Sequence, residues 1–291
     1  MADKYSAVWV SHSSIQDYLQ CPRAYYLKNI YRDPKTKHKI QLMAPPLALG
    51  SAVHEVLEAL SVLPTAERFK ESLIKKYERV WGRVSGLQGG FFRAETEREY
   101  KERGAAMLRR VMNNPGPLAN KAVKITEKLP WFWLSEPEGL ILCGKIDWLE
   151  YISESDQVHI IDFKTGKNIE KEDSLQLPIY YLLVHHCQHR EVAKASYWYL
   201  ESNDDLTPQV LPDLDEAKQK VLQIAQKIKT ARKLEHFPCP SGEQGCPACR
   251  PYEMILQGKA RLVGESEYGS DVYVLPPRDK QSDSGESSTI L

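Results

Sequence analysis

Apolar residues recur at helical spacing through most of the first third of the chain. In residues 11–31, Ile15, Tyr18 and Leu19 follow three serines that can cap a helix, and Pro22 then opens a second short helix. The same spacing predicts further helices over residues 48–63, 65–81 and 93–112. This part of the chain is therefore expected to be mainly helical.

The apolar period changes to two at residue 123, which indicates strands. They are predicted over residues 123–127, 131–134, 140–143, 145–151 and 158–164. A helix over 174–186, strands over 195–200 and 208–211 and a long helix over 213–234 follow. This order predicts an α/β fold with a central mixed sheet flanked by helices. We expect one domain over residues 1–276 and a disordered, Ser-, Asp- and Lys-rich tail over 277–291.

Charge and composition exclude several classes of protein. The chain has 291 residues with 39 Lys and Arg against 39 Asp and Glu. A neutral chain has no general attraction to polyanions, so contact with nucleic acid requires a local basic patch, for which residues 23–39 are the candidate. No apolar run reaches the roughly 18–20 residues of a membrane span, and residues 1–10 lack a signal-peptide pattern. We expect a cytoplasmic protein with reduced cysteines and no membrane partner.

The most informative stretch is residues 142–166, LCGKIDWLEYISESDQVHIIDFKTG. Asp162 and Lys164 share one face of the predicted strand, because side chains alternate between the two faces of a strand. A turn near residues 153–156 would bring Asp147, expected on the preceding strand with Lys145 on the same face, close to Asp162. Two carboxylates and an ammonium are therefore expected to converge at one end of a hairpin.

Metal-assisted hydrolysis of phosphodiesters uses this set of groups. Carboxylate oxygens hold Mg²⁺ or Mn²⁺, and a lysine orients the attacking water or offsets developing charge. The alternative is that Asp147 and Lys164 are surface residues and that Asp162 only makes a turn. Asp162 follows an apolar run, however, and a buried charge is costly unless it is paired or binds a metal.

The motifs GKIDWLE and IIDFKTG resemble those of the PD-(D/E)XK nuclease superfamily, in particular its RecB-like branch. That branch includes the CRISPR-associated adaptation nucleases and the nuclease domains of bacterial helicase-nucleases. Four further segments resemble its motifs in the same order. They are SHSSIQDYLQCPRAYY at residues 11–26, GSAVHEVL at 50–57, QLPIY at 176–180 and CPAC at 246–249.

The resemblance implies a restriction-endonuclease-like core over about residues 47–234 and a set of site residues. His54, Asp147 and Asp162 would be metal ligands, with the backbone carbonyl of Phe163, and Lys164 would be the catalytic lysine. Gln176 and Tyr180, at i and i+4 of one helix, would reach the scissile phosphate or the adjacent DNA backbone. The alternatives are a core histidine paired with Glu58 and a helix surface beside a core tyrosine.

Four cysteines form a second candidate site. Cys239, Cys246 and Cys249, in an element over residues 239–256, supply three thiolates, and the distant Cys21 supplies a fourth. Four thiolates suffice for a [4Fe–4S] cluster or a zinc ion. Cys21 lies where RecB-like iron–sulfur nucleases have a lone N-terminal cysteine, which implies a [4Fe–4S] cluster; zinc or no metal are the alternatives. Ile255 stands where these nucleases have their last cysteine, and Cys239 is the candidate replacement.

These observations predict a Mg²⁺- or Mn²⁺-dependent deoxyribonuclease, a hydrolase of phosphodiester bonds. The resemblance implies an exonuclease acting on single strands or DNA ends in repair or recombination. No Walker-type phosphate-binding motif is present, so a helicase motor would be a separate partner. The alternative is a non-catalytic DNA-binding or scaffold subunit of a helicase-nuclease or CRISPR adaptation complex.

Overall fold

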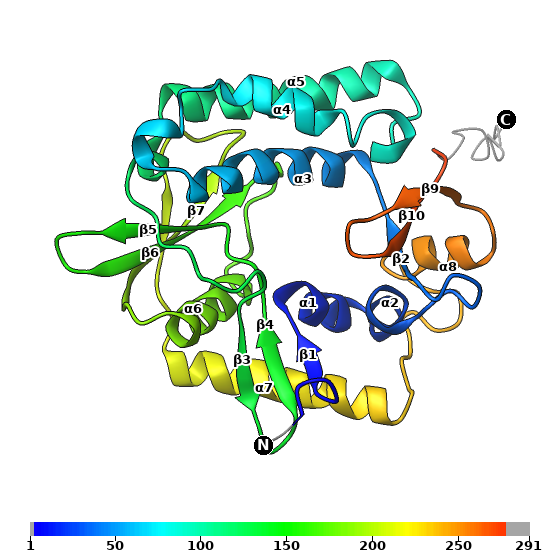
Figure 1. Ribbon diagram of the computed structural model, residues 1–291. Helices are drawn as coiled ribbons and strands as arrows, with labels where there is room; N and C mark the ends of the chain where they lie inside the picture. Colours follow the sequence, from blue (N-terminus) through cyan, green and yellow to red (C-terminus); the bar gives the residue numbers. More distant parts are fainter. Residues whose placement is uncertain (1–2, 278–291) are drawn as a thin grey trace, which may run out of the picture.

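Figure 1 shows the computed structural model, which describes residues 3–277. Within these residues the chain forms eight α-helices and ten strands, and the strands belong to three mixed sheets. The helices are α1 (His12–Gln20), α2 (Pro22–Tyr25), α3 (Pro45–Glu58), α4 (Leu73–Trp81), α5 (Ala94–Asn113), α6 (Gln176–Cys187), α7 (Leu214–Lys233) and α8 (Arg250–Leu256). The strands are β1 (Val8–Val10), β2 (Lys39–Leu42), β3 (Trp131–Ser135), β4 (Leu140–Cys143), β5 (Trp148–Ile152), β6 (Gln157–Lys164), β7 (Val192–Tyr199), β8 (Thr207–Gln209), β9 (Arg261–Glu265) and β10 (Ser270–Val274).

The largest sheet, in the order β5-β6-β7-β8, has helices on both faces. On one face, Ile161 and Phe163 of β6 belong to a core with α3, α4 and α5. On the other face, Val158 and Ile160 belong to a second core with α6 and α7. Burial on both faces explains why β6 reads as a nearly continuous apolar run. Its one buried carboxylate, Asp162, is therefore exceptional.

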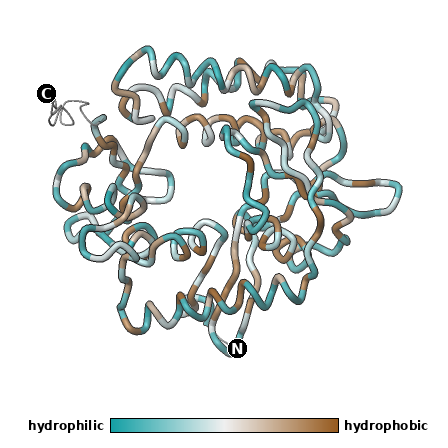
Figure 2. The backbone as a smooth tube through the Cα atoms, turned by 180° about the vertical axis from the view of Figure 1, so that it is seen from behind, coloured by the Kyte–Doolittle hydropathy of each residue, from teal (hydrophilic) through white to brown (hydrophobic). Residues whose placement is uncertain are grey.

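The elements are arranged as a ring in Figures 1 and 2, with the β5-β6-β7-β8 sheet and the β2-β10-β9 sheet on opposite sides. The second of these sheets joins distant parts of the chain, because β2 pairs in parallel with β10. Helices border the ring above and below, and Figure 2 shows apolar and polar residues alternating along α7. That alternation is typical of a helix with one buried face.

The predicted α/β class and most long elements are confirmed, including the helices α5 and α7 and the strand β6. Several predicted boundaries differ from the structure, and three predicted elements were wrong in a larger way. The helix predicted from residue 65 starts at Leu73, because the Ser72 side chain caps it by accepting from Ile74 N at 3.2 Å. The strand predicted over 123–127 is absent, and an isolated bridge at Ala122 is found instead. The strand predicted from residue 145 starts at Trp148, which leaves Asp147 outside it.

The pattern analysis missed four short strands, β1, β2, β9 and β10. Each has only three to five residues, too few for an alternating pattern to be distinctive. Of the tail predicted to be disordered, residues 278–291 lie outside the described residues. None of the helices in the described part of the chain is both long and apolar enough to cross a membrane.

His38 gives the junction of β2 and β10 a predictable pH dependence. Its Nδ1 lies 2.9 Å from Asp271 Oδ1, and this hydrogen bond raises the pKa of His38 above its usual 6.5. A raised pKa means that the stabilisation is complete below pH 6.5 and is lost as the pH rises through the folded-state value. We expect the melting temperature to decline over this window, and His38→Gln to flatten the decline. Asp271→Asn should flatten it in the same way; an unchanged slope in both variants would contradict this assignment.

Candidate active site

Strand pairing brings the two predicted aspartates together. β5 and β6 are antiparallel, with Trp148 opposite Ile161, so Asp147 immediately before β5 lies across from Asp162. The sequence pattern predicted that Asp147 and Lys145 share one face of a strand. This prediction was wrong, because β5 begins at Trp148 and both residues precede it. Instead, Asp147 Oδ2 accepts a hydrogen bond of 2.9 Å from Phe163 N, which holds the chain near the end of β6.

Helix α3 adds a histidine and a glutamate to Asp147. His54 Nδ1 lies 3.4 Å from Asp147 Oδ1 and 3.8 Å from Glu58 Oε1. The candidate ligand atoms of these three residues all lie within 4.8 Å of one another. Glu58 also forms an ion pair with Lys145. The side chains of one helix and of the turn before β5 thus form a compact group of two carboxylates and an imidazole.

Asp162 lies next to this group, and α6 supplies its hydrogen-bond donor. Gln176 Nε2 donates to Asp162 Oδ1 at 2.9 Å and to Tyr180 Oη at 3.2 Å. Lys164 Nζ lies 3.0 Å from Asp162 Oδ2 and 2.9 Å from Glu170 Oε2, and it donates to Gln176 Oε1. The helix α6 therefore orients the carboxylate and the lysine together.

The pKa values reflect burial and crowded charge. Burial, followed by the Asp147 carboxylate, raises the pKa of Asp162 to about 7, against the opposing effect of Lys164. Burial alone would lower the pKa of His54, but Asp147 reverses this and raises it to about 9. Burial also raises the pKa of Tyr180 far above its usual value, so its phenol stays protonated. Burial and a neighbouring carboxylate disfavour the ionised form of a carboxylate, and a bound cation would favour that ionised form again.

The residues present fit a divalent cation. Carboxylate oxygens with one imidazole nitrogen are the donors that Mg²⁺ and Mn²⁺ use in proteins. Asp162 is 2% exposed, and Lys164 Nζ, at 3.0 Å, forms an ion pair with its Oδ2. A buried carboxylate next to a second carboxylate is costly, and a bound cation would offset that cost. His54, Glu58 and Asp147 form one group of candidate ligand atoms, and Asp162, opposite Asp147 on the neighbouring strand, would complete the site for the ion.

The structure brings the side chains of the six predicted active-site residues to one place. His54 contacts Asp147, and ion pairs and hydrogen bonds join Asp162 to Lys164, Gln176 and Tyr180. The pairing of β5 with β6 puts Asp147 opposite Asp162 and so brings the two sets together. Sequence reasoning missed two functional candidates, Glu58 and Glu170. Glu58 stands four residues after His54, a spacing that places both on one helix face and could have identified it. Glu170 lies between β6 and α6, where no periodic pattern points to it.

The family model of the PD-(D/E)XK nuclease superfamily matches residues 9–254. The chain belongs to the PD-(D/E)XK nuclease superfamily. Nucleases of this superfamily use divalent metal ions, in agreement with the donor set around Asp162. The α/β structure described above fits the restriction-endonuclease-like fold, as the sequence predicted. A search of curated proteins finds no match to this chain.

Four cysteines form a second site in this PD-(D/E)XK chain, and they connect the segment around Cys21 with residues 239–249. The Sγ atoms of Cys21, Cys239, Cys246 and Cys249 all lie within 4.8 Å of one another. The Cys249 Sγ is 3.7 Å from that of Cys239 and 3.8 Å from that of Cys246, and all four are free thiols. Burial would raise the pKa of Cys246, but backbone amides and neighbouring thiols lower it to about 7. Four converging thiols fit a thiolate-bound metal site.

The cysteine site is supported by contacts between the same two parts of the chain. Arg23 of α2 forms an ion pair of 3.0 Å with Glu253 of α8, and its guanidinium also donates to Glu243 O at 3.2 Å. Ala24 and Leu27 pack against the cysteines in a small buried cluster. The other two cysteines, Cys143 and Cys187, lie outside this site.

Proposed function

We propose that the chain is a Mg²⁺- or Mn²⁺-dependent deoxyribonuclease. The observation that supports this most strongly is Asp162, a buried carboxylate that lies beside a second carboxylate and is ion-paired with a lysine. In a purely structural role this arrangement would only cost stability, because it buries like charges close together. In a metal-dependent nuclease the same arrangement is the binding site for the ion.

When bound, the cation supplies Lewis-acid activation of the phosphodiester and of the attacking water. Lys164 supplies positive charge beside it. Burial would lower the pKa of Lys164, but Asp162 and Glu170 raise it, so the side chain stays an ammonium. Lys164 would therefore stabilise developing negative charge and orient water. Gln176 keeps Asp162 and Lys164 in place through its two hydrogen bonds.

We further propose exonuclease action on single strands or DNA ends, in repair or recombination. The six motifs in RecB-like order support this finer assignment. The absence of a Walker-type motif supports a separate helicase or recombination partner, because the chain has no recognisable ATP-driven motor. The proposal places the protein in the cytoplasm, where reducing conditions keep the four cysteines of the second site available as thiolates.

For the cysteine site we propose a single tetrahedral ion, zinc, in preference to the [4Fe–4S] cluster that the resemblance implies. Zn–S bonds of about 2.3 Å in tetrahedral geometry separate the sulfurs by about 3.8 Å. The sulfur of Cys249 is 3.7 Å from that of Cys239 and 3.8 Å from that of Cys246, and all four sulfurs lie within 4.8 Å of one another. A [4Fe–4S] cluster binds each cysteine to a different iron and spreads the sulfurs farther apart. The proposed role is structural, since this site is distinct from the carboxylate group.

The nuclease proposal is tested by incubating end-labelled single- and double-stranded DNA with the protein and Mg²⁺, Mn²⁺ or EDTA. We expect cleavage with either metal and none with EDTA. Lys164→Ala should lower the rate by about 100-fold or more, the effect of losing one preorganised charge. Lys233→Ala, an exposed lysine of α7, is the matched control and should cleave normally. DNA binding without cleavage by the wild type under all conditions would favour the non-catalytic subunit instead.

A further inference from the structure

The hairpin of β9 and β10 presents an exposed tyrosine at its tip. Tyr268 is 90% exposed, although large aromatic side chains are usually at least partly buried. The turn that carries it is ordered by hydrogen bonds from Gly269 N to Ser266 O, at 2.9 Å, and from Ser270 N to Ser266 Oγ, at 3.1 Å. Gly269 has φ of +69°, a conformation that favours glycine. The turn thus holds an aromatic ring in solvent on a defined backbone.

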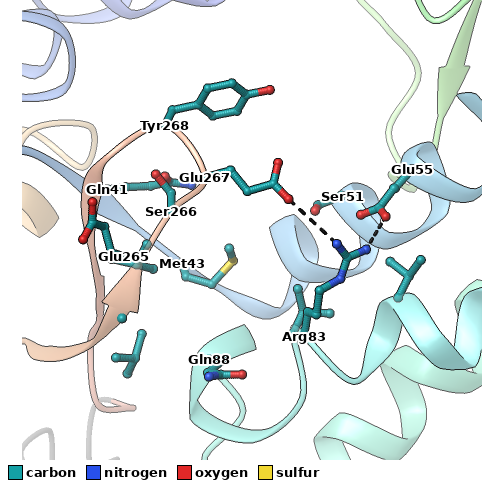
Figure 3. Close-up of a pocket in the computed structure, with 15 residues that line it drawn as sticks. Gln41, Met43, Ser51, Glu55, Arg83, Gln88, Glu265, Ser266, Glu267 and Tyr268 are labelled. Carbon is teal, nitrogen blue, oxygen red and sulfur yellow. Dashed lines mark hydrogen bonds and ion pairs between the residues drawn. The ribbon is translucent and has the colours of Figure 1, made fainter. Parts of the chain in front are cut away.

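An arginine connects this hairpin to the helix that carries His54. Arg83 forms an ion pair with Glu55 of α3, and its other nitrogen lies 3.8 Å from Glu267 of the hairpin. Figure 3 shows Arg83 between these two glutamates. Such exposed ion pairs contribute little to stability, but two on one guanidinium restrict how the hairpin lies against α3.

The hairpin and α3 enclose a groove of about 380 Å³. Figure 3 shows Gln88 at one end of this groove and Tyr268 at the other. Among the charged residues that line it, acidic ones predominate: Glu55, Glu265 and Glu267 against Arg83. This balance disfavours a phosphate. The neutral polar side chains of Gln41, Ser51 and Gln88 can instead form hydrogen bonds with an uncharged ligand.

The groove is next to the active site. Ser51, Glu55 and Glu58 follow each other at intervals of four and three residues and therefore form one stripe along α3. This stripe runs from the groove to Glu58, which belongs to the candidate metal group and pairs with Lys145. A nucleotide a short distance along the strand from the scissile phosphate can therefore reach the Tyr268 ring.

We propose that Tyr268 stacks on an unpaired base of the substrate strand and that the adjacent groove receives that base. The proposal rests on the nuclease function and adds a preference for single-stranded substrate next to the cleavage site. Stacking on an aromatic ring accepts any base, because every base has a π-face. The acidic lining keeps the phosphates out of the groove and leaves them at the metal site. Tyr268 is a positioning residue, since it contacts a base and not the reacting phosphate.

The test measures binding and cleavage separately. Fluorescence anisotropy with labelled single-stranded DNA in EDTA gives Kd without cleavage, and steady-state kinetics with Mg²⁺ give KM and kcat. We expect Tyr268→Ala to raise Kd and KM about tenfold with little change in kcat, as for the loss of one base-stacking contact. Tyr268→Phe should restore both values, because the ring alone stacks. Blunt duplex binding should be unaffected, because its bases are paired.

Tyr5→Ala is the control, since Tyr5 is also exposed, at 86%, and lies outside the groove. It should behave as the wild type. An unchanged Kd for single strands in Tyr268→Ala, or a loss that Phe does not restore, would overturn the stacking role. The two proposals can fail separately. A wild type that never cuts, but whose single-strand binding depends on the Tyr268 ring, would refute the nuclease function and retain the base-binding role.

Discussion

Asp162→Asn is expected to reduce DNA cleavage by about 10³-fold or more while the fold and DNA binding are kept. The substitution preserves the shape of the side chain, and its amide oxygen can still accept the hydrogen bond from Gln176. It removes the negative charge that would hold the cation. Several kcal/mol of transition-state stabilisation from a metal corresponds to about three powers of ten in rate. The measurement is single-turnover cleavage of labelled DNA at saturating Mg²⁺.

The same variant should be at least as stable as the wild type in EDTA at alkaline pH. The pKa of Asp162 is raised from 3.8 to about 7 by burial and by Asp147. The contribution of protonated Asp162 to the free energy of unfolding is therefore complete below pH 3.8 and is lost as the pH rises through about 7. Above that pH the buried, ionised carboxylate destabilises the folded state. Asn avoids this loss. Asp156→Asn, the same change at an exposed ion pair with Arg190, controls for the chemistry and should cleave normally. Full activity in Asp162→Asn would refute the metal site.

Cys249→Ala is expected to destabilise the protein more than any other single substitution considered above. Cys249 is fully buried and its sulfur is close to those of both Cys239 and Cys246. Structural zinc contributes folding free energy directly, and the site connects α2 to the C-terminal segment. We expect the melting temperature to fall by about 10 °C or more. A chelator that removes the metal from the wild type should have a similar effect.

The matched control is Cys143→Ala, because Cys143 is also buried but lies outside the cysteine site. Its loss should cost only about 1 kcal/mol, the value for removing a small buried group. Metal analysis of anaerobically purified protein identifies the ion. A colourless protein containing zinc is expected, whereas iron with acid-labile sulfide and a brown colour would establish a [4Fe–4S] cluster. Equal melting temperatures for the two variants would contradict a structural metal at this site.

Local patterns in the sequence determined much of the scaffold and the chemical character of the site. The helices α5 and α7 and the strand β6 were predictable, because each is long and its side chains repeat with the period of its own structure. Asp162 and Lys164 were recognisable as a pair, since they are two positions apart on one strand and therefore lie on the same face. The spacing of Cys246 and Cys249 likewise indicated that both cysteines could be ligands of one metal site.

Only the tertiary structure decided which distant groups meet. Glu58 joins His54 and Asp147 because α3 packs on the sheet face next to the end of β6. Cys21 reaches the C-terminal cysteines through the packing of α2, and β2 pairs with β10 across most of the chain. The position of Tyr268 beside the site depends on that pairing. A sequence pattern records neighbours along one helix or strand, whereas these contacts arise from the burial of apolar faces by the chain as a whole.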